Sequence, residues 1–206
     1  MNSTISIIFA VIYYTAAILA VRRLKPSIRS LTLCGIMIAM TLVLEAIQIP
    51  LPTGTTMPLC SPVPLIILAV MTDKGHAVLS GFICGILAML LIPAWQPIHF
   101  AQFFVEHMVC FSCFGFAAIF GTDKKWKILL GTVLAFILKT AGHLISGVLF
   151  FSKNAWDGWG AWGYSLGLNM SMIIPLTVIC CIIVILLPLE AMKKQVNKTV
   201  KEKKAK

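Results

Sequence analysis

The sequence predicts an all-α integral membrane protein, and three observations carry that prediction. The chain has 206 residues, of which 59% are hydrophobic and only 12% are charged, a composition that soluble domains of this length do not show. Apolar runs of about 20 residues, the length that a membrane-spanning helix needs, recur along most of the chain. The positive charges gather between alternate runs. Room remains only for loops and a tail, so a fused soluble ATPase or nucleotide-binding domain is excluded.

Seven apolar runs are the candidate membrane helices. The third is the shortest and contains Pro62 and Pro64. We expect it to tilt, to begin with irregular backbone or to stay partly buried in protein, because lipid cannot satisfy exposed backbone groups. The seven runs lie at 4–21, 31–49, 61–72, 77–93, 100–121, 128–151 and 164–188.

The distribution of positive charge predicts the orientation. Lys and Arg outnumber Asp and Glu by 17 to 7, and cytoplasmic loops of membrane proteins carry such an excess. We predict an outside N-terminus and a cytoplasmic C-terminus, with a first helix that is not cleaved because no positive segment precedes it. The basic tail is expected to face anionic lipid and not nucleic acid. All Lys and Arg except Lys139 and Lys153 lie at 22–29, 74, 124–127 and 193–206.

The predicted outside loops contain little charge but several Pro, Gly and Trp residues. They span 50–60, 94–99 and 152–163, and they are candidates for lids over a binding site. Their tryptophans also fit the aromatic belt that anchors membrane proteins at the interface. The sequence leaves both interpretations open for Trp95, Trp156, Trp159 and Trp162.

Polar residues inside the apolar runs indicate a function, because a polar group in hydrocarbon needs a partner or a water-filled cavity. In the predicted orientation they come from four helices and share a depth in the outer half of the membrane. This favours a polar pocket that opens outward, although each group could instead hydrogen-bond to a neighbouring helix. The residues are Glu45, Glu106, His107, His143 and Asn169.

Lys139 and His143 are four residues apart and therefore share a helix face. Lys139 needs a negative partner, and we expect Glu106 or Glu45 to neutralise it in a structural role. Glu106 is the better candidate for a ligand-binding group, since a carboxylate near an outer opening can accept hydrogen bonds from an amine or attract a cation.

Other signals indicate no catalytic, metal or nucleotide site. Gly158, Gly160 and Gly163 match G-x-G-x-x-G, but no strand precedes them and tryptophans flank them. Cys110 and Cys113 form a C-x-x-C on a membrane helix, which is more typical of free thiols than of a redox pair or a metal site. We therefore predict no cofactor, no metal and no catalytic residue.

Two pairs of small residues at i, i+4 can let helices approach closely. Gly81 and Gly85 are expected to serve internal packing. For Gly35 and Ala39, internal packing and a docking surface for a partner protein both fit.

A set of polar, small and aromatic residues also carries a resemblance to a known family. The set comprises Gln102, Glu106, Gly115, Leu138, Lys139, His143, Gly147, the stretch 155–160, Tyr164, Ser165, Leu166 and Asn169, with Gly35-x-x-x-Ala39. In this pattern the chain resembles the thiamine-binding S-components of energy-coupling factor (ECF) transporters, small vitamin-binding membrane proteins without an ATPase of their own. The resemblance covers about 31–188, so the first helix would be an addition to a six-helix core.

The resemblance implies that Glu106, His143, Tyr164 and Asn169 contact the vitamin, with aromatic rings packed against it. Three positions depart from the family pattern: His107 and Phe151 replace a Tyr and a stacking Trp, and Thr55 replaces a Trp of the first outside loop. The substrate is expected to be thiamine or a related small heterocyclic vitamin or precursor. The predicted substrate-binding residues are Glu106, His107, His143, Phe151, Tyr164 and Asn169.

The resemblance also implies partners and a location. Uptake would be driven by ATP through a transmembrane coupling subunit, docked at Gly35 and Ala39, and two cytoplasmic ATPases, in a bacterial plasma membrane. We divide the chain into an extra helix with a basic loop (1–30), the six-helix core (31–190) and a basic tail (191–206).

Two other functions stay open. One is a stand-alone proton-coupled secondary transporter of a small cationic solute, in which Glu106, Lys139 and His143 relay protons. The other is an intramembrane enzyme with Glu106 and His143 as acid and base, although no nucleophile or metal cluster accompanies them.

Overall fold

The computed structural model describes residues 2–22 and 24–194. Within that part, six helices are long and apolar enough to cross a membrane, and a seventh apolar helix is shorter. The prediction of an all-α membrane protein with seven apolar helices is therefore confirmed. The predicted basic tail lies mostly outside the described residues.

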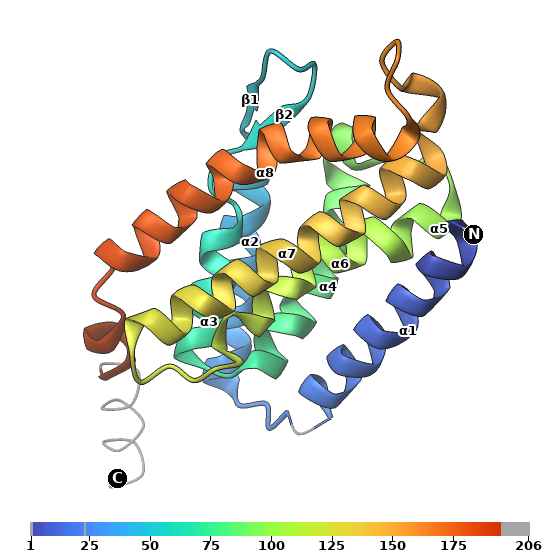
Figure 1. The fold of residues 1–206 in the computed structure, drawn as a ribbon. Coiled ribbons are helices and arrows are strands. Elements are labelled where there is room, and N and C mark those ends of the chain that lie inside the picture. The colour runs from blue at the N-terminus through green and yellow to red at the C-terminus, as the bar shows by residue number, and fades with distance from the viewer. Residues whose placement is uncertain (1, 23, 195–206) are drawn as a thin grey trace, which may run out of the picture.

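The first two helices are α1 (Asn2–Val21) and α2 (Ile28–Ala46). In Figure 1, α1 runs along one side of the bundle. α2 begins with a capping box, in which Ser27 and Ser30 each accept a hydrogen bond from the other's backbone N–H, at 3.1 and 2.9 Å. This arrangement satisfies two of the donors that a helix N-terminus leaves free.

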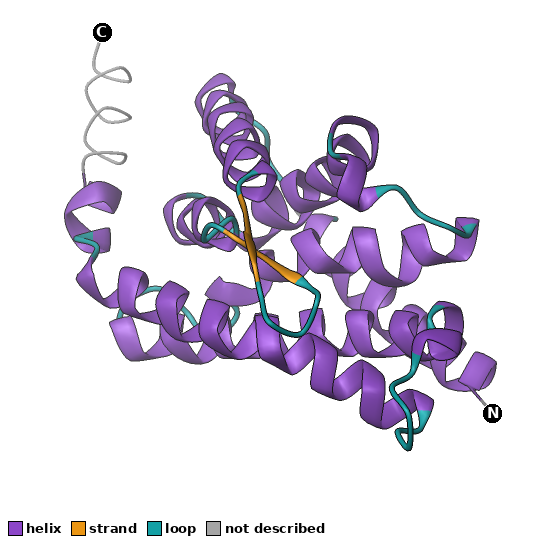
Figure 2. Ribbon diagram, turned by 90° about the horizontal axis from the view of Figure 1, so that it is seen from above, coloured by secondary structure: helices purple, strands orange, loops and turns teal. Residues whose placement is uncertain are grey.

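A small hairpin follows α2 and was not predicted. Strands β1 (Gln48–Pro50) and β2 (Thr56–Pro58) pair antiparallel, and the turn between them contains Gly54 at a φ of 85°, which favours glycine. Three-residue strands are too short to show an alternating pattern in the sequence. Figure 2, which looks down on this end of the bundle, shows the two strands crossing in front of the helices.

The short helix α3 (Pro62–Met71) is enclosed by protein. Every residue from Pro62 to Val70 is buried, and Leu65, Ile66 and Leu68 are fully so. Of the three alternatives expected for the third apolar run, burial in protein is the one that the structure shows. Ten residues rise about 15 Å, half of the hydrocarbon thickness, and burial removes the need for a longer helix.

The fifth apolar run is a membrane-length segment but not a uniform α-helix. After α4 (Lys74–Leu91) and the 3₁₀ turn η1 (Pro93–Trp95), the chain forms α5 (Phe100–Gln102), the π-helical turn η2 (Phe103–His107), α6 (Met108–Ser112) and the 3₁₀ segment η3 (Cys113–Ala118). Gly81 and Gly85 of α4 allow it to approach this segment: a Cβ at Gly81 would lie 2.3 Å from Ser112 Cα, and one at Gly85 would lie 2.8 Å from the His107 carbonyl. Their predicted role in internal packing is confirmed.

The last two long helices are α7 (Lys125–Phe150) and α8 (Ala161–Leu186), joined through the 3₁₀ turn η4 (Ser152–Asn154). They pack against each other near Gly147, where an added Cβ would meet the Ser165 side chain. The hairpin is tied to α8 by a hydrogen bond of 2.9 Å between the Thr53 and Ser171 hydroxyls. The hairpin, η2, α7 and α8 thus surround one space in the bundle.

Candidate functional site

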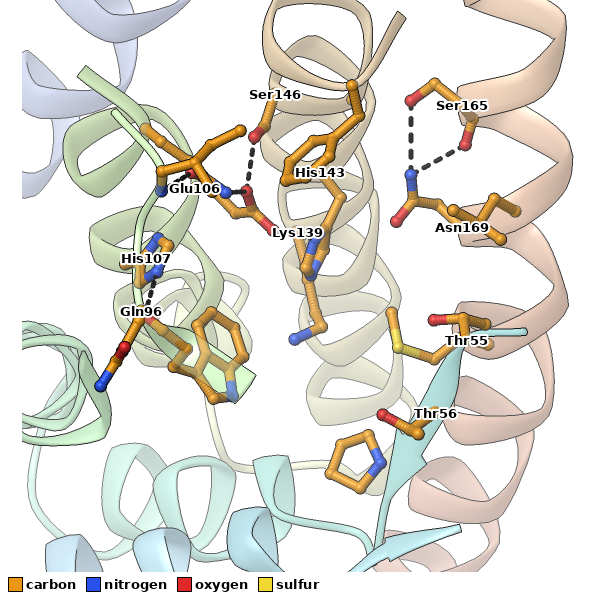
Figure 3. A pocket seen from close by; sticks show the side chains of 18 of the residues that line it. Thr55, Thr56, Gln96, Glu106, His107, Lys139, His143, Ser146, Ser165 and Asn169 are labelled. Atoms are coloured by element: carbon orange, nitrogen blue, oxygen red, sulfur yellow. Dashed lines mark hydrogen bonds and ion pairs between the residues drawn. The ribbon is translucent and has the colours of Figure 1, made fainter. Parts of the chain in front are cut away.

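A pocket of about 370 Å³ lies among these elements. Figure 3 shows its polar side chains, which reach in from η2, α7, α8 and the hairpin. All six residues that the sequence predicted for substrate binding line this pocket: Glu106, His107, His143, Phe151, Tyr164 and Asn169. The structure therefore brings together residues that lie up to 63 positions apart, while their role in binding stays a prediction.

Glu106 is held by three side-chain donors. His143 Nδ1 donates to Oε1 at 2.8 Å, and Gln102 Nε2 and the Ser146 hydroxyl donate to Oε2 at 2.9 and 2.5 Å. Each carboxylate oxygen can accept about two hydrogen bonds. Oε2 is therefore fully used, and Oε1 keeps one free acceptor position for a ligand donor.

His143 positions Glu106 and has little capacity left for a ligand. Since the carboxylate only accepts, His143 Nδ1 carries the proton. Its Nε2 lies 3.1 Å from Cys110 Sγ, and in a neutral imidazole this nitrogen accepts from the thiol. Both ring nitrogens are therefore engaged.

Asn169 offers a second acceptor. Its amide nitrogen donates to the Ser165 carbonyl at 2.8 Å and faces the Ser165 hydroxyl at 3.4 Å. This orientation leaves the Asn169 carbonyl oxygen directed toward the interior of the pocket, as Figure 3 shows. Acceptors on η2 and α8 thus face the same cavity from opposite walls.

The aromatic part of the lining includes Phe151 and the buried Tyr164. Trp156 packs edge-on against Tyr164, with ring centroids 5.1 Å apart, and against Trp159 at 5.2 Å. Trp156, Trp159 and Trp162 themselves are 37–50% exposed and do not line the pocket, so these three fit the interfacial interpretation better than Trp95 does.

Trp95 belongs to the pocket. Its indole N–H donates to Glu45 Oε1 at 3.0 Å, and its backbone carbonyl accepts a hydrogen bond of 2.6 Å from His107 Nε2. The other oxygen of Glu45 accepts from the Ser61 hydroxyl. The sequence left Trp95 open between a lid residue and an interfacial anchor, and the structure favours a place in the pocket lining.

Glu106 and Glu45 act on the charge of Lys139 only at a distance, without a direct ion pair among the described residues. Lys139 is 2% exposed and lines the pocket, but in the described part of the chain neither carboxylate lies within salt-bridge distance of it. Both carboxylates accept hydrogen bonds from other side chains. The Lys139 ammonium instead lies 5.8 and 5.9 Å from the ring centroids of Trp95 and Phe111, where the ring faces attract a cation.

The ammonium of Lys139 points into the pocket in Figure 3, with no hydrogen-bond acceptor in the described part of the chain. It can therefore donate to an oxygen of a ligand. Glu45, Glu106 and Lys139 are the formally charged groups of the lining. Counted by themselves, these two carboxylates and one ammonium leave one unit of negative charge, which matches a ligand that carries a single positive charge.

Gln102 and Ser146 were also missed as parts of the site. Gln102 is four residues before Glu106 and so shares its side of the segment, a spacing that could have identified it. Ser146 follows His143 by three residues on α7, which is the same kind of signal. Thr55, the position where the family has an aromatic residue, does line the pocket.

The pair Gly35 and Ala39 lies on the outer surface of α2. Both residues are exposed, and a Cβ added at Gly35 would have no atom within 4 Å. Packing within this chain therefore does not explain the pair. Among the described residues, no group of three or more His, Cys, Asp or Glu side chains is placed to hold a metal ion.

A multi-pass membrane protein with a pocket lined by charged and aromatic side chains fits the class of solute-binding transport proteins. A family profile described as "Thiamine transporter protein (Thia_YuaJ)" matches residues 31–196. The chain belongs to this family. The predicted resemblance to thiamine-type S-components is thereby confirmed, and the family is one of transporters and not of enzymes.

Individual relatives agree with this assignment. The thiamine transporter ThiT of Bacillus subtilis is 24% identical over 168 residues, which cover 74% of this chain and 86% of the relative. A solved structure of ThiT from Listeria monocytogenes superposes with a TM-score of 0.68 at 22% identity, covering 81% of this chain and 96% of that one. This likeness shows the shared fold. The profile match begins after α1, which is consistent with an added first helix.

Proposed function

We propose that the pocket binds thiamine and that the protein delivers it to an ECF-type ABC importer as the substrate-binding subunit. Membership of the thiamine transporter family supports this proposal. The observation in the pocket that carries it is the single free acceptor position on Glu106 Oε1, opposite the free carbonyl oxygen of Asn169.

The chemistry of thiamine fits this arrangement. Its N–H donors belong to the amino group of the pyrimidine ring. Glu106 and Asn169 can accept hydrogen bonds from this group. Its thiazolium ring carries one positive charge, which matches the net charge of the lining. Tyr164 and Phe151 offer apolar ring surface to such a cation, and the Lys139 ammonium can donate to the hydroxyl oxygen of the side chain.

The binding proposal is tested by titrating the detergent-purified protein with thiamine while following tryptophan fluorescence. A hydrogen bond to a charged group contributes about 1.5 to 3 kcal/mol, so Glu106→Gln is expected to weaken binding about 10- to 150-fold. Glu190→Gln, a carboxylate substitution at an exposed position remote from the pocket, is the matched control. Unchanged affinity in a folded Glu106→Gln variant would contradict the proposed site.

The partners form the second part of the proposal. Uptake would require a transmembrane coupling subunit and two cytoplasmic ATPases, with the coupling subunit docked on the exposed face of α2 at Gly35 and Ala39. The exposure of both small residues supports this assignment, because a small-residue pair permits close helix contact. Gly35→Trp and Ala39→Trp should abolish uptake in cells that express the module but leave thiamine binding intact.

A reconstituted system separates this mechanism from secondary transport. Vesicles that contain only this protein should accumulate no thiamine under a proton gradient, whereas vesicles with the complete module and ATP should. Accumulation by the protein alone would overturn the proposal in favour of a proton-coupled transporter. The proposed location is a bacterial plasma membrane, with the N-terminus outside and the C-terminus in the cytoplasm.

A further inference from the structure

The added helix α1 is connected to the segment that carries Glu106. It packs against α4, α7 and η2, although it lies outside the residues that the family profile matches. Tyr14 stacks on Phe82 of α4 with ring centroids 6.0 Å apart, and the Ala20 carbonyl lies 2.7 Å from where a Cβ at Gly75 would be. The C-terminal half of α1 is therefore fixed closely to the core.

The π-helical turn η2 leaves one carbonyl without its usual partner. In an α-helix the Met108 N–H would donate to the carbonyl four residues earlier, which is that of Phe104. Here the Met108 N–H donates to the Phe103 carbonyl instead, as the wider turn requires. The Tyr14 hydroxyl donates to the Phe104 carbonyl at 2.7 Å. In hydrocarbon, where water is absent, such a side-chain donor satisfies a freed carbonyl at low cost.

The same turn determines where Glu106 points. A π-helical turn accommodates one extra residue, so its conversion to an α-helix would rotate the preceding segment by about 100° relative to α6, the angle that one residue covers in an α-helix. Glu106 lies within the turn, and its contacts with His143 and Ser146 depend on that rotation. A donor that stabilises the wide turn therefore stabilises the orientation of the carboxylate.

We propose that Tyr14 is a positioning residue for the substrate site. Through its hydrogen bond to the Phe104 carbonyl, Tyr14 holds η2 in its wide form and so directs Glu106 into the pocket. This inference rests on the proposed binding of thiamine through Glu106. It assigns to α1 a role in substrate affinity in addition to anchoring the protein in lipid.

The test is Tyr14→Phe in the full-length protein, which removes the hydroxyl and keeps the ring. We expect thiamine to bind about three- to tenfold more weakly, the range for loss of one hydrogen bond. Tyr13→Phe is the matched control, since the Tyr13 hydroxyl bonds Ser112 at 2.5 Å in α6 and not the turn. It should change the stability of the protein but not its affinity for thiamine.

Two further measurements distinguish a positioning role from general loosening. The double variant Tyr14→Phe/Glu106→Gln should bind thiamine no more weakly than Glu106→Gln alone, because interacting residues are not additive. An analogue of thiamine without the amino group should bind the wild type and Tyr14→Phe equally well. The inference would be overturned if the losses of affinity from the two substitutions added up in the double variant. It would also be overturned if Tyr14→Phe weakened binding of the analogue as much as binding of thiamine. If Glu106→Gln itself has no effect, the proposed binding site fails first and independently.

Discussion

Removal of the Trp95 indole N–H tests whether this residue is part of the pocket or an interfacial anchor. Trp95→Phe retains an aromatic ring beside Lys139 but deletes the donor to Glu45 Oε1. That oxygen would keep only a contact of 3.5 Å from Gln48 Nε2, which is marginal for a hydrogen bond. We expect a loss of about 1.5 to 3 kcal/mol in the free energy of unfolding, the range for hydrogen bonds to charged groups, and toward its upper end because Glu45 is buried.

The assay is denaturant or thermal unfolding of the purified protein in detergent. Trp126→Phe is the control, since Trp126 is 54% exposed and does not line the pocket. A double-mutant cycle with Glu45→Gln isolates the interaction between Trp95 and Glu45. The effect of Trp95→Phe on stability should shrink when the carboxylate is already absent. If Trp95→Phe and Trp126→Phe change stability equally, Trp95 acts as an anchor and the reasoning is refuted.

Three further predictions follow from the contacts around the site. Cys110→Ala should weaken thiamine binding about two- to fivefold because the His143 ring loses the donor to Nε2, whereas Cys110→Ser should bind as the wild type does in the same titration. Gly131→Ala should destabilise the protein by about 1 to 3 kcal/mol, since its Cβ would lie 2.1 Å from the Ala117 carbonyl; Gly160→Ala, where the space is open, should have no such effect in thermal unfolding. A protease-sensitive tag after the last residue should be cut in inside-out vesicles and protected in right-side-out vesicles, and the opposite pattern would reverse the proposed orientation.

The membrane helices could be predicted from the sequence because lipid imposes one requirement on every span. A run of about 20 apolar residues satisfies it almost regardless of tertiary contacts. The same requirement makes Glu106, His143 and Asn169 conspicuous among apolar neighbours. Their meeting in one pocket, however, was inferred from a shared depth and a family resemblance, and only the packing of η2 and α8 against α7 establishes it.

The remaining features depend on contacts between distant segments. Glu106 or Glu45 was expected to neutralise Lys139, yet both carboxylates accept hydrogen bonds from other elements and act on its charge only at a distance. The wide turn at η2 has no signature in composition, since it results from how this segment fits against α4 and α1. The short hairpin likewise gives no periodic pattern. Only the family resemblance pointed to Thr55, which lines the pocket.

The charge of the pocket lining has a consequence for transport against a membrane voltage. If the protein reorients in the membrane to deliver a singly positive substrate, and that substrate neutralises the one unit of negative charge left by Glu45, Glu106 and Lys139, the occupied site would cross the membrane field without electrical work. The empty site carries its negative charge back, and a potential that is negative inside assists that outward return by up to about 2.3 kcal/mol per 100 mV. Substrate delivery would then be insensitive to voltage while the reset accelerates with it, a difference that uptake measurements at clamped potentials can detect.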